Sequence, residues 1–156
     1  FDTTSHSTNF PINQYMISFL SENIELPEID QTRVSRWIKL VAASHGRKAG
    51  HINYIFCDDE RILEMNKEFL QHNYYTDIIT FDYSSGKIIS GDIFISIDTV
   101  LSNANELAID YLRELYRIII HGILHLCGQD DKTEGSRAEM TAKENAALEI
   151  LQTEFI

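Results

Sequence analysis

The chain of 156 residues is long enough for one domain with a single hydrophobic core. Hydrophobic residues make up 44% and charged residues 24%, which is ordinary for a globular protein, and no apolar stretch is long enough to cross a bilayer. The formal net charge of −11 argues against a broad, nonspecific affinity for nucleic acid. Two cysteines and no recognisable signal peptide favour a protein of the reducing cytoplasm.

The charge is distributed unevenly along the chain. Residues 31–57 contain five Lys and Arg residues and no acid, and residues 58–156 contain nineteen acids against eight bases. The basic segment is either a solvated helix face or a phosphate-binding patch, and its composition does not separate the two.

Residues 1–15 begin with a polar stretch and lack hydrophobic periodicity. We interpret them as a loose or vector-derived lead, with Met16 as a possible native start. Residues 16–156 are predicted to form a single domain, because they contain no internal repeat and no linker.

Hydrophobic periodicity predicts strands and helices in turn along this domain. The first half contains a strand at 16–20, a helix from 31 that carries Val34 to Val41, a break at 46–50, a strand at 52–57, a helix from Asp58 to about Gln71, and strands at 77–83 and 91–97. The second half contains a helix capped by Asp98, a long helix from about Ile109 to Cys127 and, after Gly135, a helix from Ala138 to Phe155. The short connection at 84–87 predicts that the last two strands are antiparallel neighbours. These elements indicate an α+β or layered α/β fold.

The long helix at 109–127 carries apolar residues all round, which predicts a buried central helix. Leu112, Leu115, Ile119 and Ile123 form its predicted core seam.

The same helix ends in a candidate metal site. His121 and His125 are four residues apart and so lie one turn apart on one helical face, where two imidazoles can hold one ion. Such pairs more often belong to packing or to the surface, but here Gly128 predicts a helix end and a reversal of the chain. The reversal brings Asp130 and Asp131 back toward the imidazoles. One carboxylate there would complete a three-ligand site with an open position for water, as catalytic zinc sites have.

Arg113 and Arg117 precede His121 by eight and four residues, so they lie along the same helical face as the two histidines. Either can clamp a phosphate, and Arg117 is favoured because it lies one turn from His121. The alternative is an arginine in a surface ion pair with Glu114 or Glu139. Glu114 is in turn a candidate partner of a ligating imidazole or a surface charge.

The stretch His121-Gly122-x-Leu124-His125-Leu126-x-Gly128-x-Asp130 resembles the signature of the YbeY family of bacterial ribosomal-RNA maturation endoribonucleases. Other stretches resemble the family in the same order: Met65-Asn66, Thr76-Asp77-Ile78-Ile79-Thr80-Phe81, Gly91-Asp92-Ile93, Glu114-Leu115, and Met140 with Glu144. The similarity covers about Met16 to Leu151.

The resemblance implies a small mixed sheet of about four strands flanked by helices, with a zinc ion held by three histidines. It implies metal-dependent cleavage of single-stranded RNA, with roles in maturing the 3′ end of 16S ribosomal RNA and in ribosome quality control. Ribosomal RNA and the small ribosomal subunit are the expected partners, and neither a membrane nor an organic cofactor is expected. The expected catalytic residues are His121, Arg117 and Glu114.

Two positions depart from the family pattern. Asp131 stands where the family has its third histidine ligand, so we predict His121, His125 and Asp131 as the metal ligands. A carboxylate makes the site harder, so Mn²⁺, Ni²⁺ or Fe²⁺ become alternatives to Zn²⁺. Leu70 stands where the family usually has an arginine that is thought to serve RNA cleavage or binding. The alternative function is therefore a metal-bearing ribosome assembly factor with weak or no catalysis. A metallopeptidase is less favoured, since Gly122 takes the place of the required glutamate.

Overall fold

The computed structural model describes residues 15–70 and 76–154, and its centre is a four-stranded sheet in the order β1-β2-β4-β3. The strands are β1 (Ile17–Ser21), β2 (Lys48–Cys57), β3 (Ile78–Asp82) and β4 (Ile88–Ser96). β1, β2 and β4 run parallel, and β3 pairs antiparallel with β4. The predicted α+β class and the antiparallel pairing of the last two strands are confirmed. The predicted lead at 1–15, apart from Tyr15, and the predicted helix end at Phe155 lie outside the described residues.

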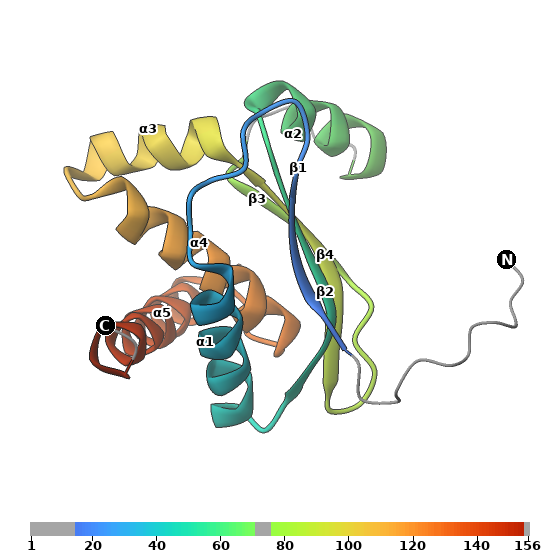
Figure 1. Ribbon diagram of the computed structural model, residues 1–156, viewed down its shortest axis with the longest axis vertical. Coiled ribbons are helices and arrows are strands. Elements are labelled where there is room, and N and C mark those ends of the chain that lie inside the picture. The colour runs from blue at the N-terminus through green and yellow to red at the C-terminus, as the bar shows by residue number, and fades with distance from the viewer. Residues whose placement is uncertain (1–14, 71–75, 155–156) are drawn as a thin grey trace, which may run out of the picture.

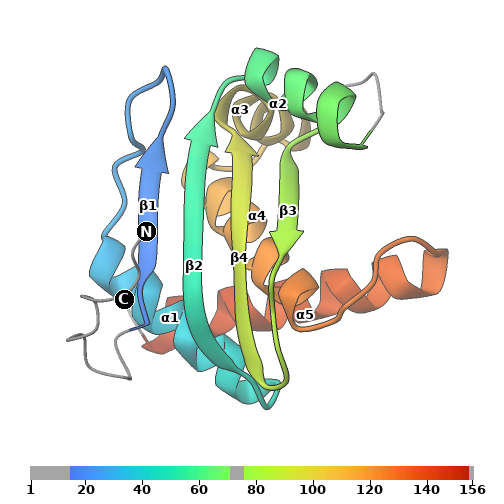
Figure 2. The same ribbon diagram turned by 90° about the vertical axis from the view of Figure 1, so that its right-hand side faces the viewer.

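The helices lie mostly on one face of the sheet (Figure 1). They are α1 (Gln31–Ser44), α3 (Ile97–Leu107), α4 (Tyr111–Leu126) and α5 (Glu134–Glu154). Helix α2 (Asp59–Met65) and the π-helical turn Asn66–Leu70 that continues it lie at one end of the sheet, and Ile62 and Met65 pack there with Ile79 in a second small core. Figure 2 shows the sheet from the face that α1, α4 and α5 leave open. None of the helices within the described ranges has both the length and the apolar character to cross a membrane.

The main core lies between the sheet and the helices α1, α4 and α5. Alternate residues of β2, including Tyr54, point into it, because successive side chains of a strand face opposite sides. Trp37 of α1 donates its Nε1–H to the carbonyl of Ala147 in α5 at 2.8 Å, and the Tyr54 hydroxyl donates to the carbonyl of Ile119 in α4 at 2.8 Å. The polar tips of these buried aromatic residues are thereby satisfied, and they fix how the helices are placed on the sheet.

Two predicted element starts were wrong in the first two thirds of the chain. Ser96 rather than Asp98 caps α3, because the Ser96 hydroxyl accepts the N–H of Thr99 at 3.3 Å. Strand β2 begins at Lys48, inside the predicted break, because its first residues pair with β4 from Ile88 onward.

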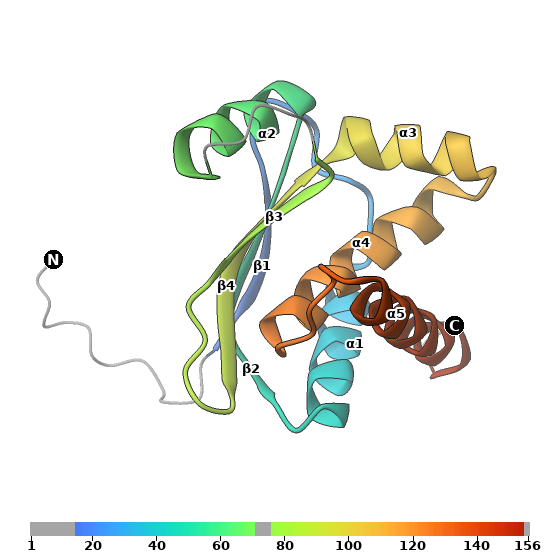
Figure 3. The same cartoon turned by 180° about the vertical axis from the view of Figure 1, so that it is seen from behind.

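Helix α5 begins at Glu134 and not at Ala138. The reason is a reciprocal cap, in which Thr133 Oγ1 accepts the N–H of Ser136 at 3.0 Å and Ser136 Oγ accepts the N–H of Thr133 at 2.9 Å. Because α5 begins one turn earlier than predicted, the loop that joins α4 to α5 is shorter and spans residues 127–133 (Figure 3).

Helix α4 approaches the sheet very closely at Gly122. A Cβ atom at this position would lie 3.1 Å from Cδ1 of Ile93 and 3.2 Å from Cδ1 of Ile78, so any side chain here would require these two isoleucines to shift. The predicted burial of the central helix is confirmed for Leu115 and Ile123, which are both fully buried. Leu112, predicted in the same seam, is 39% exposed and lies in the first turn of α4.

Candidate metal centre

The end of α4 is a Schellman turn. Gly128 donates its N–H to the carbonyl of His125, and Gln129 donates its N–H to the carbonyl of Leu124, both at 2.9 Å. Gly128 has a φ angle of +98°, which glycine adopts without the strain that a side chain would add. The predicted helix end at Gly128 is confirmed, and the turn directs the chain back along the histidine face.

The two imidazoles present the same ring nitrogen to one point. The ring centroids of His121 and His125 are 4.5 Å apart. His121 Nδ1 lies 2.5 Å from Glu144 Oε2, and His125 Nδ1 lies 2.9 Å from the carbonyl oxygen of Gln129. Because a carbonyl and an ionised carboxylate only accept hydrogen bonds, these partners assign the proton to Nδ1 in both rings. The Nε2 lone pairs are therefore available to a metal ion.

Asp131 lies beside both Nε2 atoms. Its Oδ2 is 3.4 Å from Nε2 of His121 and 3.3 Å from Nε2 of His125. One ligand atom from each of the three residues lies within 4.8 Å of the other two. Asp130 instead accepts the N–H groups of Asp131 and Lys132 with its carboxylate, and so closes the turn. The structure thus brings together the three residues predicted as ligands and directs Asp130 elsewhere.

This donor set suits a divalent metal. Two imidazole nitrogens and one carboxylate oxygen are the protein ligands of many catalytic zinc sites, which keep a further position for water. The side chains of His121, His125 and Asp131 are 15%, 28% and 34% exposed, so water can reach the group. The carboxylate oxygen also suits Mn²⁺ or Fe²⁺, so the residues alone do not select the ion.

Glu144 of α5 is a partner of the site that the residue patterns did not identify. Its side chain is 3% exposed and contacts His121 Nδ1 and, at 3.0 Å, Nη1 of Arg117. Burial opposes ionisation of this carboxyl, but the hydrogen bonds from His121 and Arg117 and the charge of Arg117 outweigh it and lower the pKa of Glu144. The sequence marked Glu144 only as a family-like position. Its contact with His121 depends on how α5 packs against α4, which no local pattern encodes.

Arg117 is held by two carboxylates. Its Nε and Nη2 contact the two oxygens of Glu114 at 2.9 and 2.5 Å, and its Nη1 contacts Glu144. Burial opposes its charge, but Glu114 and Glu144 raise the pKa of Arg117 above its ordinary value. The expected pair with Glu114 is present, but it is internal, since Glu114 is fully buried. Glu139, the other expected partner, contacts Gln129 instead, and Glu144 takes the place beside an imidazole that we considered for Glu114.

A further buried carboxylate, Asp77, extends this network. Asn103 of α3 donates from Nδ2 to Asp77 at 3.3 Å and to Glu114 at 3.4 Å. Burial raises the pKa of Asp77, against the opposing charge of Arg117. The polar network therefore runs without a break through Asp77, Asn103, Glu114, Arg117, Glu144 and His121.

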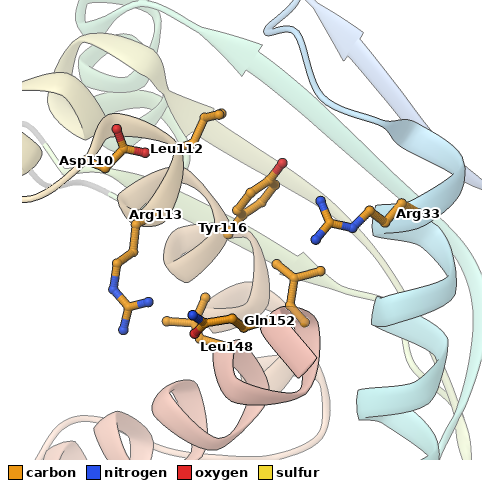
Figure 4. Close-up of a pocket in the computed structure, with 8 residues that line it drawn as sticks. Arg33, Asp110, Leu112, Arg113, Tyr116, Leu148 and Gln152 are labelled. Atoms are coloured by element: carbon orange, nitrogen blue, oxygen red, sulfur yellow. The ribbon is translucent and has the colours of Figure 1, made fainter. Parts of the chain in front are cut away.

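Arg113 lies away from the metal group. With Arg33 and Tyr116 it lines a cavity of about 350 Å³ between α1, α4 and α5, and none of the predicted metal ligands lines this cavity (Figure 4). Arg33 of α1 is partly buried and points into this cavity. Of Arg113 and Arg117, only Arg117 belongs to the polar network that contains His121.

The fold and this site define a class: an α+β unit with a candidate metal centre of three residues at the end of its central helix, an arrangement found in metal-dependent hydrolases. The family model described as endoribonuclease YbeY matches residues 16–152, and the chain belongs to this family.

Similar proteins agree with this assignment. Endoribonuclease YbeY of Parabacteroides distasonis is 58% identical over 88% of this chain and 97% of the relative. The protein of the same name from Phocaeicola vulgatus is 56% identical over 87% of this chain and 99% of the relative. The solution structure of TM1509 from Thermotoga maritima matches with a TM-score of 0.62 and 25% identity, covering 90% of this chain and 91% of that one. The family and the enzyme class predicted from the motif are confirmed.

Proposed function

We propose that this chain is a metal-dependent endoribonuclease that cleaves single-stranded RNA at a centre formed by His121, His125 and Asp131. One observation carries the proposal: two Nε2 atoms and a carboxylate converge, while Glu144 and Gln129 hold both rings in the ligating tautomer. The relatives named endoribonuclease supply the substrate class.

A divalent ion at these three residues would lower the pKa of a bound water and polarise a phosphoryl oxygen. The chain's own residues hold the ligands in place. Glu144 orients the ring of His121, and the Gln129 carbonyl orients the ring of His125. His121 therefore acts at the reacting centre, whereas Arg117 and Glu114 are positioning residues: Glu114 holds Arg117, and Arg117 keeps Glu144 ionised beside the ligand.

The proposed substrate is the precursor 3′ end of 16S ribosomal RNA, and the proposed setting is maturation and quality control of the small ribosomal subunit in the cytoplasm. Membership of the family supports the substrate and the setting. Cys57 and Cys127 are both free thiols, which suits a reducing compartment. Zn²⁺ is the first proposed ion, with Mn²⁺, Ni²⁺ and Fe²⁺ as alternatives because of the Asp131 oxygen.

A metal-bearing assembly factor with weak catalysis is the second candidate. It is favoured by Arg117, whose nitrogens are engaged by two carboxylates, so that this guanidinium offers little to a substrate phosphate. A peptidase is disfavoured by geometry, since the Cβ direction at Gly122 points into the sheet at Ile93 and leaves no room for a glutamate.

The deciding experiment incubates the purified chain with single-stranded and double-stranded RNA, with chelator, and with chelator followed by Zn²⁺ or Mn²⁺. The endoribonuclease proposal expects internal cleavage of the single strand that chelator stops and one metal restores, and that His125→Ala lacks. Metal binding with no cleavage by any ion would instead support the assembly factor.

A further inference from the structure

Two basic side chains from distant parts of the chain reach the turn that carries the metal ligands. Nη2 of Arg47 donates to the carbonyl of Cys127 at 3.1 Å, and Nζ of Lys143 donates to Oε1 of Gln129 at 2.6 Å. Gln129 is also the residue whose carbonyl holds His125. Arg47 and Lys143, here called the loop cations, therefore contact the turn between His125 and Asp131.

The charges of the loop cations are not neutralised locally. Within residues 15–70 and 76–154, neither one forms an ion pair with a carboxylate, and both contact neutral oxygens. Two acids lie near the same turn: Glu139 accepts a hydrogen bond from Gln129, and the charge of Asp82 acts on Cys127. Neither acid engages the loop cations. Uncompensated cations at this place, in a chain of net charge −11, indicate an anionic ligand.

Arg47 also lines a cavity of about 380 Å³. Three cations and no acid line it, and we call it the basic pocket: Tyr15, Lys39, Ala43, Arg47, Lys48 and Ala49. The ammonium of Lys48 lies over the ring of Tyr15, 5.7 Å from its centroid, which favours one place for this charge. The basic pocket collects three of the five cations of the segment 31–57, whereas Arg33 faces the other cavity (Figure 4).

We propose that the loop cations and the basic pocket bind the phosphates of an RNA strand that flank the phosphate reacting at the metal centre. Arg47 belongs to both groups, so the positive charge continues from the metal turn to the start of β2. We call the loop cations and the basic pocket together the track. Ammonium and guanidinium groups bind phosphates by charge and carry no base preference here, so the track contributes affinity and not sequence specificity. This inference rests on the proposed function, because it takes the reacting phosphate to lie at the metal centre.

The test measures binding of a fluorescent single-stranded oligoribonucleotide of about ten nucleotides by anisotropy, at a series of KCl concentrations. The full chain is treated with chelator, so that no cleavage occurs. Each lost phosphate contact lowers the slope of log K against log[salt] by about 0.7, which is an affinity loss of about eightfold at roughly 0.05 M salt. We expect this change for Arg47→Gln, Lys48→Gln and Lys143→Gln singly. Arg113→Gln removes the same charge outside the track and should leave the slope unchanged.

Two controls keep the result interpretable. Arg47→Gln can disturb the Schellman turn, so zinc content is measured for every variant, and Arg47→Lys should retain the wild-type slope. The Lys48 side chain donates no hydrogen bond within residues 15–70 and 76–154, so Lys48→Gln tests the charge alone.

Unchanged slopes in all three variants, or an equal loss in Arg113→Gln, overturn the track. Competition by polyglutamate that matches RNA at equal charge also overturns it and points to an acidic protein partner. Wild-type cleavage of the same RNA with metal restored is measured separately. Metal-dependent cleavage with unchanged slopes removes the track alone, whereas track-dependent binding without cleavage removes the proposed catalysis alone.

Discussion

The two imidazoles of the candidate centre have different hydrogen-bond partners. Nδ1 of His121 faces the buried carboxylate of Glu144, and Nδ1 of His125 faces a backbone carbonyl. A carboxylate partner raises the basicity of a ligating imidazole through its full charge, in addition to fixing the ring. His121 is therefore the ligand whose donor strength depends on another side chain.

Glu144→Gln should weaken zinc binding by about 10–100-fold. The amide keeps the shape of the side chain and can still accept from Nδ1, but the charge is lost. Competition with a chromophoric chelator measures the affinity. Glu149→Gln is the matched control, because Glu149 is an exposed acid on the same helix. Equal zinc affinities of the wild type and Glu144→Gln would show that the charge of Glu144 does not strengthen metal binding.

Asp131→His should change metal preference more than stability. Asp131 lies in the loop between α4 and α5 and is partly exposed, so few packing contacts are at stake. Nitrogen in place of oxygen favours Zn²⁺ over Mn²⁺, and the higher net charge of the site lowers the pKa of metal-bound water. RNA cleavage by the variant should therefore extend to lower pH when both proteins carry the same metal. Identical selectivity and identical pH profiles would remove Asp131 from the ligand set.

Some residues of the site could be predicted from short sequence patterns, whereas other contacts depend on how distant helices pack. His121 and His125 could be predicted from helical spacing, and the glycine turn limited the third position to Asp130 or Asp131. The choice of Asp131 came from the family resemblance and not from a local pattern. The contact of Glu144 with His121 could not, since it depends on the rotation of α5 against α4. The bond of Asn103 to Glu114 is similar, because it requires α3 and α4 to meet.

At the scale of elements, Gly122 sets how closely α4 lies on the sheet. Gly122→Ala should destabilise the fold by about 1–3 kcal/mol, because its Cβ would press on Ile93 and Ile78. Urea unfolding measures the change. Gly135→Ala is the control, since a Cβ there meets no atom within 4 Å and the helix gains a better former. An undiminished stability of Gly122→Ala would mean that α4 moves off the sheet without cost.

Element types could be predicted better than element starts. Alternating apolar residues identified β2, and the turn at 84–87 identified the β3–β4 hairpin. The starts of α3 and α5 were wrong, because several polar residues stand near each start and only side-chain geometry selects the cap. Ser96 caps α3 although Asp98 is an equally good capping residue, and Thr133 caps α5 although Gly135 follows.

For the molecule as a whole, a metal that binds only the folded chain adds stability by mass action. Zinc at about 100 times its dissociation constant should add about 2.7 kcal/mol, a rise in Tm of about 5–10 °C. Thermal melting with zinc and with chelator measures the shift. His125→Ala should melt near the metal-free wild type and show no shift, because the core does not depend on the ion. A full shift in this variant would contradict the ligand assignment.

The proposed centre also has a consequence for the order of folding. Its ligands and their partners all lie between Glu114 and Glu144, in the hairpin of α4 and α5. The sheet requires longer closures, because β1 pairs with β2 at Ile17 and Ile52, and β2 pairs with β4 at Tyr54 and Ile93. Short chain closures form earlier than long ones, so the hairpin can assemble while the strands are still separate. Zinc should then stabilise the folding nucleus, and so raise the refolding rate as well as lower the unfolding rate. Stopped-flow refolding with and without zinc, with His125→Ala as the control, measures this directly.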